Sequence, residues 1–140
     1  LLYQLERVHQ QVRPDLFKEG AKKYTVNELK DMLKDKTMPI FAAVDENDVM
    51  KGYAFCVFQD HKGDTVLNDI KTLYIDDLCV DENCRGQHIG SVLYEAVKKF
   101  AKEQGCYNVT LNVWECNPSA RKFYEKAGLK PYKTGMEVIL

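Results

Sequence analysis

The sequence lacks a charge excess, because 20 lysines and arginines are matched by 21 aspartates and glutamates and the formal net charge is −1. A protein dedicated to a polyanion normally carries a basic excess, so we expect no nucleic-acid partner. All apolar runs are shorter than the ~18 residues of a membrane span, and no stretch has the pattern of a secretory signal. These absences predict a cytoplasmic protein with no membrane partner.

Paired cysteines are lacking as well. The five cysteines are an odd number, and no Cys-x-x-Cys occurs, which argues against a disulfide framework and fits a reducing compartment. Cys79, Cys84 and His88 have the one metal-like spacing. A fourth ligand has no obvious place and Cys79 lies in an apolar run, so we predict no metal and keep a zinc-dependent regulatory domain as an alternative.

Internal repeats, low-complexity tracts and linkers rich in Gly, Pro or Ser are also missing. A chain of 140 residues is too short for two independent cores, so we predict a single domain over residues 1–140. Hydrophobic residues make up 45% and charged residues 29%, which is typical of a globular protein and excludes a disordered or fibrous one.

Hydrophobic periodicity predicts helices and strands in a definite order. A helix over residues 1–12 comes first, and a capping box at Thr25 and Glu28 opens a second helix. They are followed by strands at 40–44, 49–59 and 70–80, a helix from Ile89 that stops at Gly105, a strand at 107–114, a helix over 118–127, and one or two strands within 129–140.

The connections between these elements predict the fold class. The short turn between 40–44 and 49–59 favours an antiparallel hairpin, and the unit from strand 70–80 to strand 107–114 should be a right-handed parallel crossover. We therefore predict an α/β protein with a mixed, mostly antiparallel central sheet and helices on both faces.

The loop between strand 70–80 and the helix at Ile89 has the features of an anion site. Backbone N–H groups in the first turn of a helix lack partners within the helix, and the helix dipole favours negative charge there. Gly86 and Gly90 let the backbone approach a bulky phosphate, and Arg85 adds a fixed positive charge. The loop is neither a P-loop nor a dinucleotide fingerprint, and a plain strand-to-helix connection remains the alternative.

Three segments of the sequence resemble a known family. Arg85-Gly86-Gln87-His88-Ile89-Gly90 resembles the acyl-CoA loop of the GNAT family of N-acetyltransferases, Gln/Arg-x-x-Gly-x-Gly/Ala, with His88 where the family usually has Gly. Residues 75–80 resemble the family's fourth strand, and residues 117–129 resemble its Asn…Ala…Phe-Tyr…Gly segment. The segments follow in the family's order, and the element order extends the likeness over nearly the whole chain.

The resemblance implies acetyl-CoA as cosubstrate, bound where the parallel strands 70–80 and 107–114 splay apart. The pantetheine arm would pair with the backbone of one strand segment, and the pyrophosphate would meet the backbone of the loop. By this likeness the cofactor-binding residues are Leu78, Cys79 and Val80 on the strand, Arg85, Gly86, Gln87, His88, Ile89, Gly90 and Ser91 in the loop, and Asn117, Ser119, Ala120 and Tyr124 beyond it.

The family's reaction is direct attack of a primary amine on acetyl-CoA in a ternary complex, without a covalent enzyme intermediate. Tyr124 would protonate the leaving thiolate. Asp76-Asp77 resembles the Glu-Asp-x-x-Val stretch of polyamine acetyltransferases, where the first acid is the base and the second binds the cationic amine. Strand alternation sends the two to opposite faces. Trp114-Glu115 resembles the substrate side of the same enzymes and makes Glu115 a secondary candidate.

The resemblance leaves the acceptor amine open. The paired acids favour a small cationic amine, while a protein lysine or N-terminal amine is an alternative within the same enzyme class. A CoA-binding module without catalysis is a further alternative, although Tyr124 and both acids argue against it. A homodimer is also left open.

Overall fold

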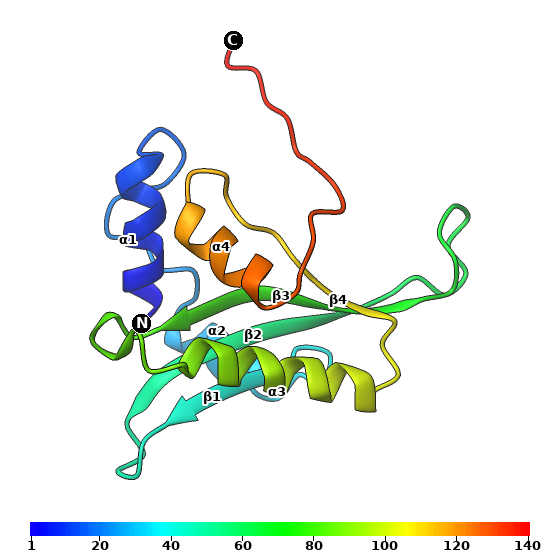
Figure 1. Cartoon of the computed structure of the whole chain (residues 1–140), viewed down its shortest axis with the longest axis horizontal. Coiled ribbons are helices and arrows are strands. Elements are labelled where there is room, and N and C mark those ends of the chain that lie inside the picture. The colour runs from blue at the N-terminus through cyan, green and yellow to red at the C-terminus, as the bar shows by residue number, and fades with distance from the viewer.

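Four strands form one sheet in the order β1-β2-β3-β4 (Figure 1). The computed structural model describes all 140 residues. β1 (Ile40–Val44) pairs antiparallel with β2 (Met50–Asp60), and β2 pairs antiparallel with β3 (Lys71–Val80). β4 (Asn108–Leu111) is parallel to β3. The predicted mixed, mostly antiparallel sheet is therefore confirmed.

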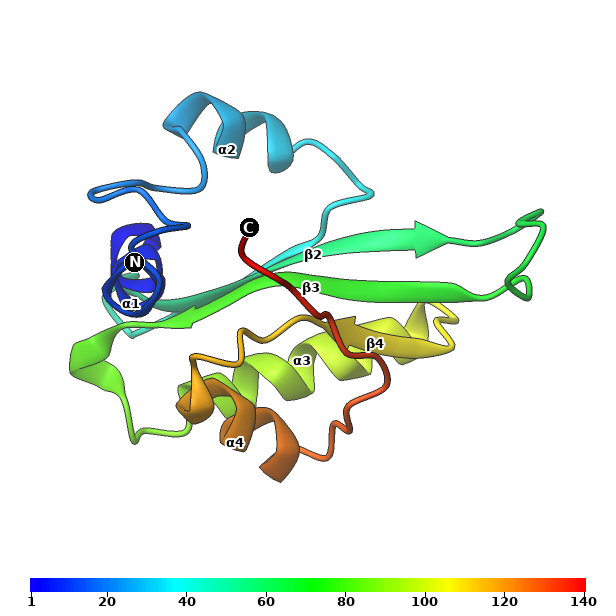
Figure 2. The same ribbon diagram turned by 90° about the horizontal axis from the view of Figure 1, so that it is seen from above.

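Helices cover both faces of this sheet, as predicted. They are α1 (Leu2–Val12), α2 (Val26–Met32), α3 (Ile89–Glu103) and α4 (Pro118–Lys126), and Figure 2 shows α2 on one side of the sheet with α3 and α4 on the other. None of them combines the length and the apolar character that crossing a bilayer requires. The core under α3 consists of Ala54, Cys56, Leu73, Ile75, Tyr94, Val97 and Ala101, and a second cluster facing α1 and α2 contains Met32, Tyr53, Phe55 and Cys79.

Local signals place the helix ends where the sequence predicts them. The capping box forms fully, since Thr25 Oγ1 accepts from Glu28 N at 3.2 Å and Glu28 Oε2 accepts from Thr25 N at 2.7 Å. Asn117 caps α4 through a hydrogen bond from Ala120 N at 3.1 Å. These contacts satisfy backbone groups that a helix end would otherwise leave unpaired.

β4 is shorter than predicted, because it ends at Leu111 and not at residue 114. Its pairing with β3 runs only from the register of Thr72 with Asn108 to that of Ile75 with Leu111. Beyond this point the two parallel strands separate and no ladder continues. The splayed strand pair of the family fold is therefore present.

The prediction of strands within 129–140 is wrong. This segment contains no strand, and residues 131–140 are exposed. Figure 1 shows the C-terminal segment running away from the sheet. Arg13 Nη1 holds Glu137 Oε1 at 2.6 Å, but no neighbouring strand offers backbone partners. A β-prone sequence needs such a partner to form a strand, so residue preference alone misled the prediction.

β3 carries one residue more than its partner β2 at a β-bulge. Asp77 is opposite Phe55 and Ile75 is opposite Cys56, so Asp76 has no partner residue on β2. The bulge shifts the alternation of side chains along β3. Ile75 therefore packs under α3, whereas Asp77 turns to the face covered by α1 and α2.

The bulge corrects the prediction that Asp76 and Asp77 face opposite sides. Tyr24, which packs against the cluster facing α1 and α2, donates its hydroxyl hydrogen bond to Asp76. Tyr53 in the same cluster donates to Asp77. Both carboxylates therefore lie on one face of the sheet.

Candidate active site

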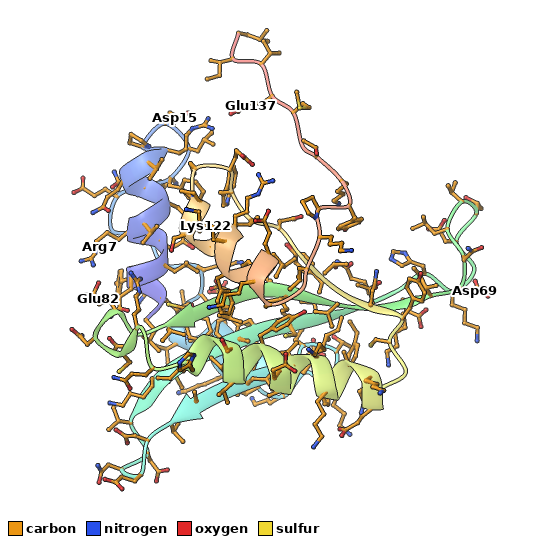
Figure 3. All side chains as sticks on the ribbon, in the orientation of Figure 1. Arg7, Asp15, Asp69, Glu82, Lys122 and Glu137 are labelled. Atoms are coloured by element: carbon orange, nitrogen blue, oxygen red, sulfur yellow. The ribbon has the colours of Figure 1, made fainter.

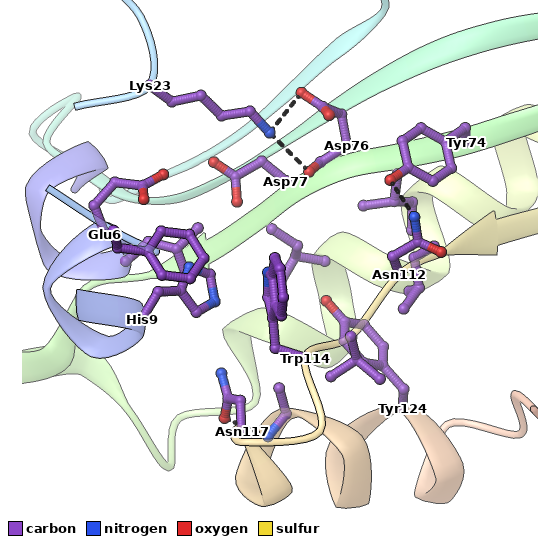
Figure 4. A pocket seen from close by; sticks show the side chains of 17 residues that line it. Glu6, His9, Lys23, Tyr74, Asp76, Asp77, Asn112, Trp114, Asn117 and Tyr124 are labelled. Atoms are coloured by element: carbon purple, nitrogen blue, oxygen red, sulfur yellow. Dashed lines mark hydrogen bonds and ion pairs between the residues drawn. The ribbon is translucent and has the colours of Figure 1, made fainter. Parts of the chain in front are cut away.

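A cavity of about 370 Å³ opens where β3 and β4 separate (Figure 4). It is bounded by α1, by the segment between α1 and α2, by β3, by the residues after β4 and by α4. Its lining combines aliphatic side chains with acidic and aromatic ones, with Glu6, Asp76 and Asp77 as carboxylates, Phe17, Tyr74, Trp114 and Tyr124 as aromatic rings, and Lys23 as a cation.

The carboxylate of Asp76 accepts a hydrogen bond from one side chain and forms an ion pair with another. Tyr24 Oη donates to Asp76 Oδ2 at 2.6 Å, and Lys23 Nζ lies 2.9 Å from the same oxygen. Lys23 Nζ also donates to the backbone carbonyl of Asp76 at 3.2 Å. The Asp76 side chain is therefore fixed in place by residues of the segment that precedes α2.

Asp77 is more buried and has fewer partners. Its exposed fraction is 7%, and its one hydrogen bond comes from Tyr53 Oη to Oδ2 at 2.9 Å. Burial raises the pKa of Asp77 to about 6, although the Tyr53 hydrogen bond and nearby Lys23 oppose this shift. A carboxylate with a pKa near neutrality can accept and release protons at pH 7.

Tyr124 reaches the same cavity from α4 and, with Asp77, lines its wall (Figure 4). Burial raises the pKa of Tyr124, and the nearby Asp77 carboxylate adds to this effect. The phenol therefore stays protonated at neutral pH and can serve as a proton donor. Asn117, at the start of the same helix, also lines the cavity.

The loop after β3 presents unpaired backbone donors to solvent. No backbone N–H from residue 85 to residue 91 donates a hydrogen bond. These groups lie at the N-terminal end of α3, a helix of 15 residues, where the helix dipole favours negative charge. Arg85 adds a positive charge beside them. The donor set thus fits a pyrophosphate, as the resemblance implies.

Backbone conformation explains the glycine preference in this loop. Gly86 has φ +80° and His88 has φ +60°, both in the left-handed region. Glycine adopts this region freely and other residues rarely do, so His88 is strained where the family usually has Gly. Gly90 has a different reason, since a Cβ there would lie 3.3 Å from the Phe123 ring.

The remaining predicted residues lie in different places. Leu78 and Ala120 line the cavity, whereas Ser119 is exposed and does not. Glu115 is 87% exposed and pairs with Arg121 at 2.9 Å, outside the cavity lining.

The cysteines of the metal-like spacing lie apart from such a site. Cys79 is buried and Cys84 is half-buried in the 3-10 turn Glu82–Cys84. No three His, Cys, Asp or Glu side chains are grouped in a way that could hold a metal ion.

Sequence reasoning missed the side of the cavity built by α1 and residues 13–25. Glu6 and His9 line it from α1, and Lys23 lines it from the segment that follows. His9 packs on the Phe17 ring at 5.1 Å, and its Nδ1 is buried without a hydrogen-bond partner. The spacing of Leu5 and Glu6 with His9, four and three residues apart on one helical face, was the available signal.

A family model described as the acetyltransferase (GNAT) family matches residues 3–129. The chain belongs to the GNAT family of acetyltransferases. The family, enzyme class and fold expected from the resemblance are thereby confirmed. This family uses acetyl-CoA, and the loop and cavity described above are consistent with that use.

Named relatives and solved structures are similar to this GNAT protein over different lengths. A stretch of 59 residues, 42% of this chain, is 36% identical to 38% of the glucosamine 6-phosphate N-acetyltransferase of Arabidopsis thaliana. A stretch of 93 residues, 66% of this chain, is 32% identical to 58% of N-alpha-acetyltransferase 30 of Schizosaccharomyces pombe. The matches thus span less than two thirds of these relatives. A crystal structure of a mutant BH1408 protein from Bacillus halodurans has a TM-score of 0.93 and 27% identity, over 99% of this chain and 88% of that one.

Proposed function

We propose that this GNAT protein transfers the acetyl group of acetyl-CoA to the primary amine of a small cationic acceptor. The observation that carries the proposal is that Asp77 and Tyr124 line one cavity at the splay of β3 and β4. One group has a pKa near neutrality and the other stays protonated. This is the pair of groups that amine acetylation needs. We also propose that residues 1–140 act as one domain.

The charge of the cavity supports a cationic acceptor. Glu6, Asp76 and Asp77 contribute three carboxylates against the one ammonium group of Lys23. The side chain of Glu6 makes no hydrogen bond or ion pair within the protein, and its carboxylate lines the cavity. Phe17 and Trp114 lie edge to face at 5.2 Å and form an aromatic wall beside these acids, a surface that attracts cations. A volume of about 370 Å³ suits a small molecule.

We propose Asp77 as the base. The family resemblance implies the reverse, with Asp76 as the base and Asp77 binding the cationic amine. A free alkyl amine has a pKa near ~10.4 and is almost fully protonated at pH 7, so it must lose a proton before it can attack. Asp77 accepts that proton, directly or through water, and the amine attacks the thioester carbon. Asp76, held by Lys23 and Tyr24, positions the acceptor through its charge.

Tyr124 completes the reaction as the acid. The C–S bond breaks as the C–N bond forms, and the departing thiolate, with a pKa near ~8.5, takes the phenolic proton. The new amide nitrogen gives its extra proton to the Tyr124 phenolate, and Asp77 releases its proton to solvent, so an ammonium ion and acetyl-CoA yield the amide, CoA thiol and one proton. The reaction proceeds in a ternary complex, and neither Cys79 nor another thiol is needed as a nucleophile.

An N-terminal amine of a protein is the second candidate acceptor. The similarity to N-alpha-acetyltransferase 30 extends over 66% of this chain and favours it. The chemistry would be the same, because an N-terminus is also a primary amine. The two acceptors differ in the part of the molecule beyond the amine, which the cavity must also accommodate: a small cationic molecule in one case and a polypeptide chain in the other.

The test compares wild type and Tyr124→Phe with acetyl-CoA and a panel of acceptors, measured by thiol release. The panel contains polyamines, glucosamine 6-phosphate and short peptides with free N-termini. Loss of the hydroxyl keeps the ring, so kcat is expected to fall about tenfold to a thousandfold with little change in acetyl-CoA affinity. Wild-type turnover by the Phe variant would reject the acid role, and preference for peptides would select the second acceptor class.

A further inference from the structure

Lys23 places an amine inside the proposed active site. It belongs to the irregular segment between α1 and α2, and its side chain is 33% exposed. Figure 4 shows the ammonium group between the side chains of Asp76 and Asp77. Its Nζ lies 2.9 Å from Asp76 Oδ2 and donates to the Asp76 carbonyl at 3.2 Å.

This ammonium is chemically the same group as the proposed acceptor. It is a primary alkyl amine, it is bound by the acids that would bind a cationic substrate, and Tyr124 lines the same cavity. Other lysines have no such surroundings. The side chains of Lys34 and Lys99 are 79% and 80% exposed, and each contacts only one carboxylate of its own helix or turn.

We propose that the protein acetylates its own Lys23, an inference that rests on the proposed function. The ammonium leaves Asp76 and gives one proton to Asp77, and the free amine attacks the thioester carbon. The C–N bond forms, the C–S bond breaks, and Tyr124 protonates the thiolate. The new amide nitrogen returns its extra proton to the Tyr124 phenolate, and Asp77 releases its proton to solvent. The products are Nε-acetyl-Lys23, CoA thiol and one proton, so atoms and charges balance with acetyl-CoA as the one co-reactant.

Two features favour this transfer over chance modification. The segment that carries Lys23 has no regular hydrogen-bond ladder, and the long side chain can turn within the cavity. Because the amine is tethered beside the acids, its effective concentration there exceeds that of a free amine in dilute solution. Acetylation removes the positive charge, so Asp76 loses its ion pair and the acetyl group takes up part of the acceptor space.

The experiment incubates the purified chain with acetyl-CoA and no added amine, and follows each lysine by peptide mass spectrometry. Lys23 should become acetylated at least about tenfold faster than Lys34 and Lys99, which report non-enzymatic reaction. The rate constant should not depend on protein concentration, because the transfer is intramolecular. Tyr124→Phe should slow Lys23 about tenfold or more and leave the two control lysines unchanged.

The outcomes separate this inference from the proposed function. Self-acetylation is overturned, and the proposed function stands, if wild type turns over free amines but acetylates Lys23 no faster than Lys34. The same conclusion follows if Lys23 is acetylated at the same rate in Tyr124→Phe as in wild type. If neither free amines nor Lys23 react, both fail. A melting curve checks that Tyr124→Phe is folded, and Asp77→Asn provides a second variant in which Lys23 acetylation should also fall.

Discussion

Asp77→Asn should lower activity and raise stability, which is an unusual combination for a buried residue. Burial raises the pKa of Asp77 from 3.8 to about 6, a difference of about two units. Each unit corresponds to 1.36 kcal/mol, so holding the ionised carboxylate in its buried place costs the fold about 3 kcal/mol above pH 6. Asparagine has nearly the same shape and carries no charge, so it removes this cost.

The sign of the pH dependence follows from proton binding. Between about pH 4 and pH 6 the folded state holds the Asp77 proton and the unfolded state has released it, so wild-type stability falls with rising pH over this window. The variant lacks this contribution. The difference in unfolding free energy between variant and wild type should therefore be near zero below pH 4 and reach about 2–3 kcal/mol at pH 8.

Urea unfolding of both proteins at pH 4, 6 and 8 measures this difference, and thiol release measures activity. Asp76→Asn is the matched control, because it removes the negative charge that pairs with Lys23 and accepts from Tyr24. This variant should be less stable than wild type at pH 8, by about 1 kcal/mol. The reasoning is refuted if Asp77→Asn is no more stable than wild type at pH 8. It is also refuted if the gain is the same at pH 4 and pH 8.

Two further substitutions test the loop. His88→Gly should stabilise the protein by about 1 kcal/mol in urea unfolding, because φ +60° strains a residue with a side chain. A destabilised variant would mean that the imidazole makes a contact that outweighs the strain. Gly90→Val should destabilise by about 1–3 kcal/mol and weaken acetyl-CoA binding, because its Cβ meets the Phe123 ring at 3.3 Å. Melting curves with and without acetyl-CoA check both effects, and a Val variant that melts like wild type would show that the ring moves freely.

Local sequence signals predicted most of the fold. The capping box at Thr25, the cap at Asn117 and the apolar stripe of α3 each depend on residues close together in the chain. The bulge at Asp76 does not, since it arises from the register between β2 and β3. The length of β4 and the fate of residues 129–140 depend in the same way on which strands are available as partners.

The same distinction between local sequence signals and long-range packing applies to the residues of the candidate site. The loop at 85–91 and Tyr124 lie within continuous motifs, so the sequence could indicate them. Glu6 and Lys23 enter the cavity from segments far along the chain from Asp77, and the packing of α1 and of the segment after it against the sheet brings them there. The partners of Asp76, which decide how free its carboxylate is, also come from this distant segment.

The extra residue in β3 divides one strand between two tasks. Before the bulge, Leu73 and Ile75 pack into the core beneath α3, and after it Asp77 and Cys79 face the layer of α1 and α2. The cavity draws on both halves, since Tyr74 lines it together with Asp76 and Asp77. A deletion of Asp76 would remove the bulge and leave Ile75 and Asp77 as direct neighbours on opposite faces, so the positions that follow would keep their layers. The one side chain lost would be the carboxylate that holds Lys23 and Tyr24 beside the cavity.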